Sequence, residues 1–168
     1  MRADPTLVRR PSWPLVEQLA RARLGCEFMP EEDITFATLN RGGEERFQTL
    51  RRELGVSSFG LSLIVLQPGQ RGRIHNHERQ EEVYLVLAGE LMLSVEGTQH
   101  VLGVDRVVRI GPSVRRQLVN AGKERLVLLA IGGSGEHAGR DGHAWESWEE
   151  SGPGRPPQEV PPPTDLPV

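Results

Sequence analysis

The chain has 168 residues, a formal net charge of −3 and a pI near 6.0. This length suits one domain with a sizeable core, and the charge balance gives no basic field that would attract nucleic acid or an anionic membrane. The single cysteine, Cys26, excludes an intrachain disulfide and is typical of a reducing compartment, so we expect a cytoplasmic protein.

The first residues are not followed by a long apolar stretch, so we expect no signal peptide. No run approaches the roughly 18 apolar residues that would span a bilayer. Lys123 is the one lysine among 20 basic residues, a ratio typical of proteins from GC-rich bacterial genomes.

The N-terminal part carries a predicted helix. Residues 1–11 are basic and we expect them to be poorly ordered. In residues 12–24 the apolar side chains fall on one helical face, namely Val16, Leu19, Ala20 and Leu24. We interpret this segment as a short amphipathic helix that covers one side of the domain, and a membrane-surface helix is the weaker alternative because the apolar face is only about three turns long.

Short strands follow, separated by turns rich in glycine and proline. The predicted strands are residues 34–40, 46–51, 59–67, 73–77, 82–87, 91–95, 99–102, 106–110, 115–119 and 126–131. Many short strands at this spacing are typical of an antiparallel sandwich or barrel.

The C-terminal part changes character after residue 131. Residues 136–150 are predicted to form a surface arm anchored by Trp145 and Trp148, and the alternative is a lid that brings His137 or His143 to the site. Seven of the last eighteen residues are proline and they show no apolar period. Residues 151–168 are therefore predicted to be a disordered tail.

The residues that carry chemistry lie between Gly69 and Gly89. His75 and His77 are two apart, so in a strand both side chains point to the same face. Glu82 opens an apolar strand, where a buried carboxylate needs a partner. Two histidines and one carboxylate can hold a divalent ion and leave coordination positions open.

The spacing of these five residues resembles the first motif of the cupins at every fixed position. The resemblance implies an all-β protein, a cupin-type antiparallel jelly-roll β-barrel, with a divalent metal ion (Mn, Fe, Zn or Ni) in its mouth and no nucleotide cofactor. The predicted organisation is an N-terminal arm, helix and first strands (1–55), a barrel (56–135), a surface arm (136–150) and a tail (151–168).

The second cupin motif is degenerate in this chain. It aligns without gaps over residues 104–120, where four positions fit the family pattern: Val108, Ile110, Pro112 and Asn120. Three others depart from it, namely Asp105, Gly111 and Ser113. The fourth metal ligand, a histidine in the family, is Arg116 here.

Arg116 cannot ligate a metal because guanidinium stays protonated and has no acceptor. Three arrangements are open. A metal binds His75, His77 and Glu82 while Arg116 swings toward the mouth; Arg116 pairs with Glu82 in place of the metal; or a register slip turns Gln117 inward as a weak oxygen ligand. We interpret the neighbouring Arg115 as a solvated charge.

The resemblance favours a barrel that holds a small anionic organic molecule at the two-histidine, one-carboxylate metal site, with oxygenase or isomerase-type turnover. Tyr84 lies on the face of Glu82 and would line the pocket or donate a proton. The alternative is a metal-free ligand-binding or structural cupin in which Arg116 neutralises Glu82. Residues 82–87 are apolar on both faces, so we also predict a homodimer through sheet packing.

Overall fold

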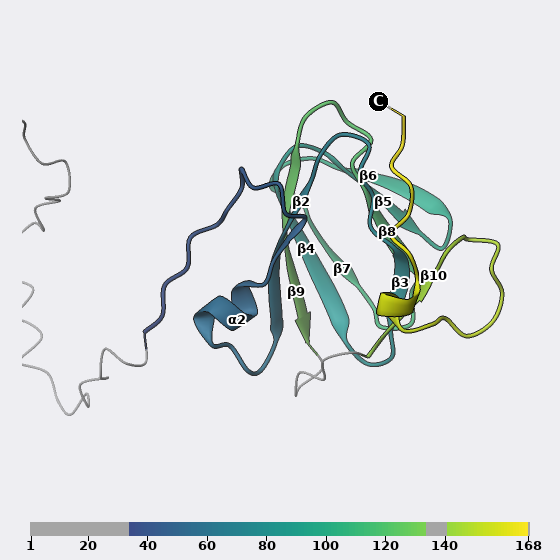
Figure 1. The fold of residues 1–168 in the computed structure, drawn as a ribbon, viewed down its shortest axis with the longest axis horizontal. Helices are drawn as coiled ribbons and strands as arrows, with labels where there is room; N and C mark the ends of the chain where they lie inside the picture. Colours follow the sequence, from purple (N-terminus) through teal and green to yellow (C-terminus); the bar gives the residue numbers. More distant parts are fainter. Residues whose placement is uncertain (1–33, 134–140, 168) are drawn as a thin grey trace, which may run out of the picture. The chain divides into compact units, whose positions relative to one another are not determined.

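The computed structural model describes residues 34–133 and 141–167, and all elements named below lie in the unit Thr35–Val168. The predicted helix at residues 12–24, Cys26 and His137 lie outside the described residues. Two five-stranded antiparallel sheets face each other (Figure 1). The predicted all-β, jelly-roll fold is therefore confirmed.

The first sheet has the strand order β1-β2-β9-β4-β7 and the second has the order β10-β3-β8-β5-β6. The strands of the first are β1 (Phe47–Gln48), β2 (Gly60–Leu66), β9 (Leu126–Gly133), β4 (Glu81–Ala88) and β7 (Val107–Ile110). Those of the second are β10 (Gly142–Trp145), β3 (Ile74–His77), β8 (Arg116–Val119), β5 (Leu91–Val95) and β6 (Thr98–Leu102).

The main core lies between the two sheets. Alternate residues of β2, β4 and β9 point inward, as the period of two in a strand requires. They meet inward residues from the second sheet, and the buried set includes Ile64, Leu66, Tyr84, Val86, Leu91, Leu93, Leu118, Leu126 and Leu128.

A second, smaller core covers the outer face of the first sheet. Helix α2 (Leu50–Leu54) places Leu50 and Leu54 one turn apart, and both pack on Leu63, Val65 and Val127. The helix ends at Gly55, whose φ of 71° is the left-handed conformation that glycine adopts without steric cost.

The sequence prediction fails at the two earliest strands. Residues 34–40 form no strand, and Phe36 is 88% exposed there. The segment 46–51 holds the two-residue β1 and then the start of α2. The helix brings Leu50 and Leu54 one turn apart into the same apolar cluster, whereas in a strand they would share a face but lie about 13 Å apart.

The C-terminal segment is not a disordered tail. Residues 155–166, which we call the strap, lie along the barrel and include a 3₁₀ turn at Pro157–Glu159. Arg155 and Ala144 exchange backbone hydrogen bonds of 3.0 and 2.8 Å, and the N–H of Leu166 donates to the carbonyl of Gly69 at 2.8 Å. Val160 is only 1% exposed.

Three arginines of the barrel hold the strap. Proline-rich chain has few donors of its own, so its carbonyls need donors from elsewhere. The guanidiniums supply them in three contacts: Arg73 Nε to Val160 O (2.6 Å), Arg71 Nε to Thr164 O (2.7 Å) and Arg46 Nη2 to Asp165 Oδ1 (3.1 Å).

The surface arm is anchored through Arg115 as well as through tryptophan. The guanidinium of Arg115 lies 5.5 Å from the ring centroids of both Trp145 and Trp148, and its Nε is 3.2 Å from Glu96 Oε2. The prediction that Arg115 is a solvated charge is therefore wrong, because two aromatic faces attract the cation. Trp145 closes β10 and is 6% exposed.

The outer face of the first sheet is not fully covered by the described residues. Val107 is 60% exposed and Ile131 is 38% exposed. The homodimer through this sheet stays a prediction. No helix within the described ranges is long and apolar enough to cross a membrane.

Deletion of residues 152–168 should destabilise the protein. Burial of a valine contributes about 1.5–3 kcal/mol, and one kcal/mol shifts the Tm of a chain this size by about 2–4 °C. We expect a loss of about 4 °C or more in a thermal scan. Glu159→Ala, an exposed strap substitution, is the control and should change Tm by about 1 °C or less. An unchanged Tm for the deletion would show that the strap does not pack.

Candidate functional site

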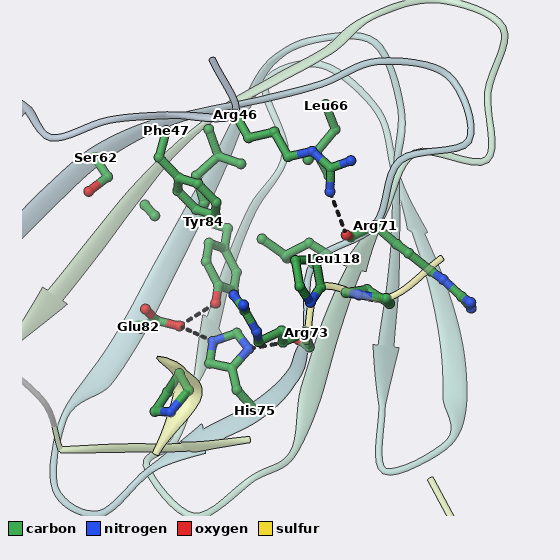
Figure 2. Close-up of a pocket in the computed structure, with 16 residues that line it drawn as sticks. Arg46, Phe47, Ser62, Leu66, Arg71, Arg73, His75, Glu82, Tyr84 and Leu118 are labelled. Atoms are coloured by element: carbon green, nitrogen blue, oxygen red, sulfur yellow. Dashed lines mark hydrogen bonds and ion pairs between the residues drawn. The ribbon is translucent and has the colours of Figure 1, made fainter. Parts of the chain in front are cut away.

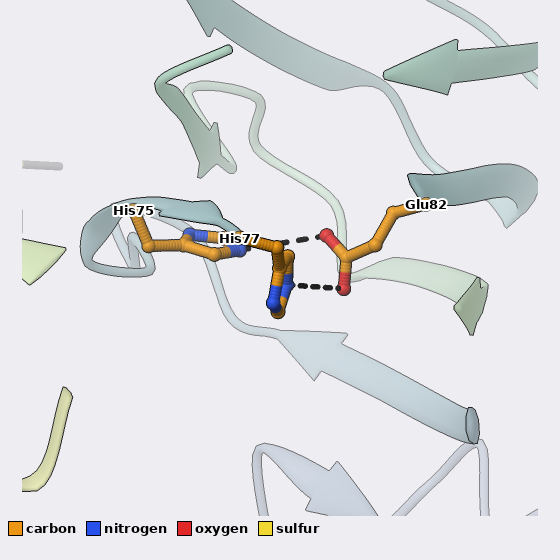
Figure 3. A group of neighbouring side chains, drawn as sticks. All are labelled: His75, His77 and Glu82. Atoms are coloured by element: carbon orange, nitrogen blue, oxygen red, sulfur yellow. Dashed lines mark ion pairs between the residues drawn. The ribbon is translucent and has the colours of Figure 1, made fainter. Parts of the chain in front are cut away.

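His75, His77 and Glu82 converge inside the barrel (Figure 3). Both histidines lie on β3 in one sheet, and Glu82 lies on β4 in the facing sheet. His75 Nε2 is 3.5 Å from Glu82 Oε2, and His77 Nε2 is 3.3 Å from Glu82 Oε1. One ligand atom from each residue lies within 4.8 Å of the others, so the three can share one ion.

Each imidazole is oriented through its other nitrogen. His75 Nδ1 lies 3.1 Å from the carbonyl of Arg73, and His77 Nδ1 lies 2.8 Å from Asp141 Oδ1. Both neighbours are acceptors, so a proton on Nδ1 satisfies each of them, and this contact holds each ring with Nε2 directed toward Glu82. His77 Nε2 is buried and has no partner with hydrogen-bond geometry among the described residues.

Asp141 is the residue that sequence reasoning missed. It lies 64 positions from His77, outside the cupin motifs, at the start of the arm that carries β10. The N–H of Gln80 donates to its second oxygen at 3.0 Å and fixes the carboxylate. Metal-ligating histidines commonly donate to such a carboxylate. The local signal was weak, because one aspartate in a polar segment has no distinctive spacing.

Arg116 points into the site and pairs with Glu82. The side chain is fully buried, and its Nη2 lies 2.6 Å from Glu82 Oε2. Its Nη1 donates to the carbonyls of Pro112 and Val114 at 3.3 and 3.1 Å. The Tyr84 hydroxyl donates to the same Glu82 oxygen. Oε2 is therefore fully engaged, whereas Oε1 faces His77.

Gln117 is not part of this site. β8 pairs with β3 so that Arg116 lies opposite His75, which turns the next residue to the other face of the sheet. Its amide donates to the carbonyl of Gly72 at 2.9 Å. The predicted register slip is therefore wrong.

The charges of the site are strongly coupled. Burial opposes ionisation of Glu82, but the adjacent His75 and His77 and the charge of Arg116 outweigh it and hold the pKa of Glu82 well below its usual value. Burial likewise opposes protonation of His77, yet Glu82 and Asp141 raise its pKa. A metal ion at Nε2 would have to displace a proton whenever this ring is charged.

The neighbouring groups keep their ordinary charge states. Burial and the nearby Glu82 carboxylate raise the pKa of Tyr84 well above its usual value, so the phenol stays neutral. Burial works against the charge of Arg116, but Tyr84 and Glu82 favour it and its pKa is raised. For Asp141 burial is outweighed by the hydrogen bond with His77, and its pKa is lowered.

A cavity of about 520 Å³ opens in front of His75 and Glu82 (Figure 2). This volume falls in the range of small-molecule sites. Its walls are largely apolar, formed by Phe47, Ile64, Leu66, Tyr84, Leu118 and Ala130, with Pro157, Pro162 and Pro163 of the strap. The strap thus forms one wall of the site, which the expectation of a disordered tail could not provide.

Residues 62–132 match the family model described as Cupin domain. This stretch runs from within β2 to within β9, so the part of the chain that forms most of the two facing sheets is similar to a cupin domain. A curated protein named polyketide synthase CurC, from Streptomyces cyaneus, is 30% identical over 89 residues, which cover 53% of this chain and 58% of that protein. The chain thus spans a little over half the length of this relative.

Solved structures share the fold. A cupin protein from Bacteroides fragilis is 20% identical with a TM-score of 0.54, covering 61% of this chain and 85% of that one. A sugar phosphate isomerase from a cupin superfamily, from Silicibacter pomeroyi, is also 20% identical with a TM-score of 0.54, covering 68% of this chain and 76% of that one. At this identity the likeness concerns the fold alone.

The effects of substituting Arg116 and Glu82 on the free energy of unfolding should depend on each other. Arg116→Met leaves Glu82 without its cation, and breaking a buried pair in this way costs about 3–5 kcal/mol. The double variant Glu82→Gln/Arg116→Met leaves neither charge and should recover at least about half of that loss. Urea unfolding in the presence of a chelator measures both. Equal stabilities of the single and double variants would contradict the coupling.

Proposed function

We propose that this cupin binds a divalent metal ion through His75, His77 and Glu82 and holds a small anionic organic molecule in the adjoining cavity. The observation that carries the proposal is the convergence of the two Nε2 atoms and Glu82 at the inner end of an apolar cavity. Two histidines and one carboxylate leave coordination positions for a ligand.

The donor set fits a metal ion. Both imidazoles are held by acceptors at Nδ1, and His77 Nε2 is buried without a hydrogen-bond partner among the described residues. A bound ion would polarise a ligand oxygen or activate dioxygen, the chemistry of isomerase or oxygenase turnover. Tyr84, whose hydroxyl lies at Glu82 and lines the cavity, is placed to donate a proton.

Arg116 determines what else the site binds. A divalent ion about 4 Å from a guanidinium is repelled by roughly 8 kcal/mol at an effective dielectric constant near 20. Glu82 offsets part of this repulsion, and an anionic ligand between the two cations would offset more. The charge of Arg116 therefore supports an anionic ligand.

The cavity walls support a ligand with an apolar body. Most of the lining side chains are aliphatic, aromatic or proline, which suits an organic acid better than a sugar phosphate.

A metal-free binding module is the second candidate. The contact of 2.6 Å between Arg116 and Glu82 favours it, because the guanidinium already neutralises the carboxylate. In this version Arg116 would neutralise Glu82, and His75, which lines the cavity, would bind the ligand's anionic group directly.

Metal analysis tests the proposal. Protein purified without chelators or a metal-binding tag should contain about one equivalent of Mn, Fe, Zn or Ni, and His77→Ala should lose it. Asp141→Asn, which removes the carboxylate that orients His77, should weaken metal binding by about 10–100-fold. His100→Ala, a substitution on exposed β6, is the control and should keep the metal. Metal-free wild type that binds no added ion would favour the second candidate.

Arg116→His should strengthen metal binding. The substitution removes a positive charge and adds an imidazole at the position of the family's fourth ligand, and both changes favour a divalent ion. We expect affinity for Mn²⁺ or Zn²⁺ to rise at least about tenfold, or about 1.4 kcal/mol, by calorimetric titration. Arg116→Lys keeps the charge and should show no gain. Equal affinities of wild type and Arg116→His would place the ion elsewhere.

A further inference from the structure

A second cavity adjoins the first at Glu82. It measures about 360 Å³ and lies between α2 and the ends of β2, β4 and β9 nearest to Gln80. The two cavities share Ser62, Glu82 and Ala130 as lining residues. Figure 2 shows Ser62 and Glu82 on the same side of the main cavity. The two cavities are therefore adjacent.

Gln80 presents a free polar atom to this second cavity. The residue is 7% exposed, and its Oε1 is buried without a hydrogen-bond partner among the described residues. The side chain lies against Gly132, where a Cβ would approach Gln80 Nε2 to 2.5 Å, so only glycine leaves room for it. Buried side-chain amides are normally hydrogen-bonded, and because Oε1 is an acceptor the missing partner is a donor, such as a hydroxyl of the ligand.

Two guanidiniums line the same cavity. Arg51 and Arg52 come from α2, and neither forms an ion pair within the part of the chain that the structure describes. Arg51 Nε is buried and also lacks a hydrogen-bond partner there. Glu82, the acid that lines this cavity, is already paired with Arg116. The second cavity is thus positively charged.

We propose that this second cavity is an anion subsite, in which Arg51 and Arg52 bind the carboxylate or phosphate group of the ligand. Guanidinium binds both groups through paired N–H donors, and the unpaired Nε of Arg51 is such a donor. The proposal deepens the proposed function and rests on it for the apolar part of the ligand, which lies in the main cavity. The arginines of the main cavity are less available, because Arg46, Arg71 and Arg73 hold the strap.

Inorganic phosphate has no apolar body, so its binding tests the subsite without a contribution from the main cavity. Calorimetric titration of wild type should show binding that weakens about tenfold or more in Arg51→Gln/Arg52→Gln, because charge-assisted hydrogen bonds are lost. Arg106→Gln/Lys123→Gln is the control, since it removes two exposed charges that line neither cavity. Phosphate bound equally by the wild type and the Arg51/Arg52 variant, or bound by neither, would overturn the subsite.

A second pair of probes tests the link between the cavities. Wild type should bind 2-naphthoate about tenfold or more tightly than neutral 2-naphthamide, and the Arg51/Arg52 variant should lose this preference while its affinity for the amide is unchanged. An unchanged preference in the variant would overturn the link. His77→Ala separates the two proposals, because it should lose the metal but bind phosphate as wild type does. If wild type itself binds no metal, the proposed function fails while the phosphate result still stands.

Discussion

The negative charge of Glu82, buried between two sheets, is the constraint on which the polar end of this barrel depends. A carboxylate with 14% of its side chain exposed needs compensation, and the structure supplies it from three strands. β8 contributes Arg116, β4 contributes Tyr84 and β3 contributes His75 and His77. A metal ion held by His75 and His77 would use the same carboxylate that Arg116 already pairs with.

The sequence predicts the three residues that converge at this site, but it does not predict the residues that orient and enclose them. Five residues at fixed spacing place both histidines on one face of β3 and Glu82 at the start of β4. The orientation of Arg116 could not be predicted, because all four residues of β8 are buried and show no alternation between polar and apolar faces. Without alternation, a shift of one residue is as plausible as the observed register. Pairing with β3, opposite His75, decides it.

For a related reason, the sequence did not reveal that the strap packs on the barrel or that Asp141 contacts His77. Local composition describes what a segment can do alone, and a proline-rich segment alone is disordered. The partners of the strap are arginines on the barrel, more than eighty residues away for Arg71 and Arg73. Asp141 is also remote from His77, at 64 residues along the chain. Such contacts depend on the finished fold. They also mean that the site extends beyond residues 62–132, because one wall and one orienting carboxylate come from later residues.

The main cavity is largely apolar and the second cavity is lined by two arginines, and this difference sets the orientation of the proposed ligand. Prolines of the strap have no N–H to offer, so the wall they form is apolar and does not compete for an acidic group. Arg51 and Arg52 on the other side are not engaged in ion pairs among the described residues and attract that group. An organic acid with its anionic end toward α2 and its apolar body under the strap would place the atoms next to the acidic group beside Glu82. Those atoms would also lie nearest to His75 and Tyr84, which line the main cavity with Glu82.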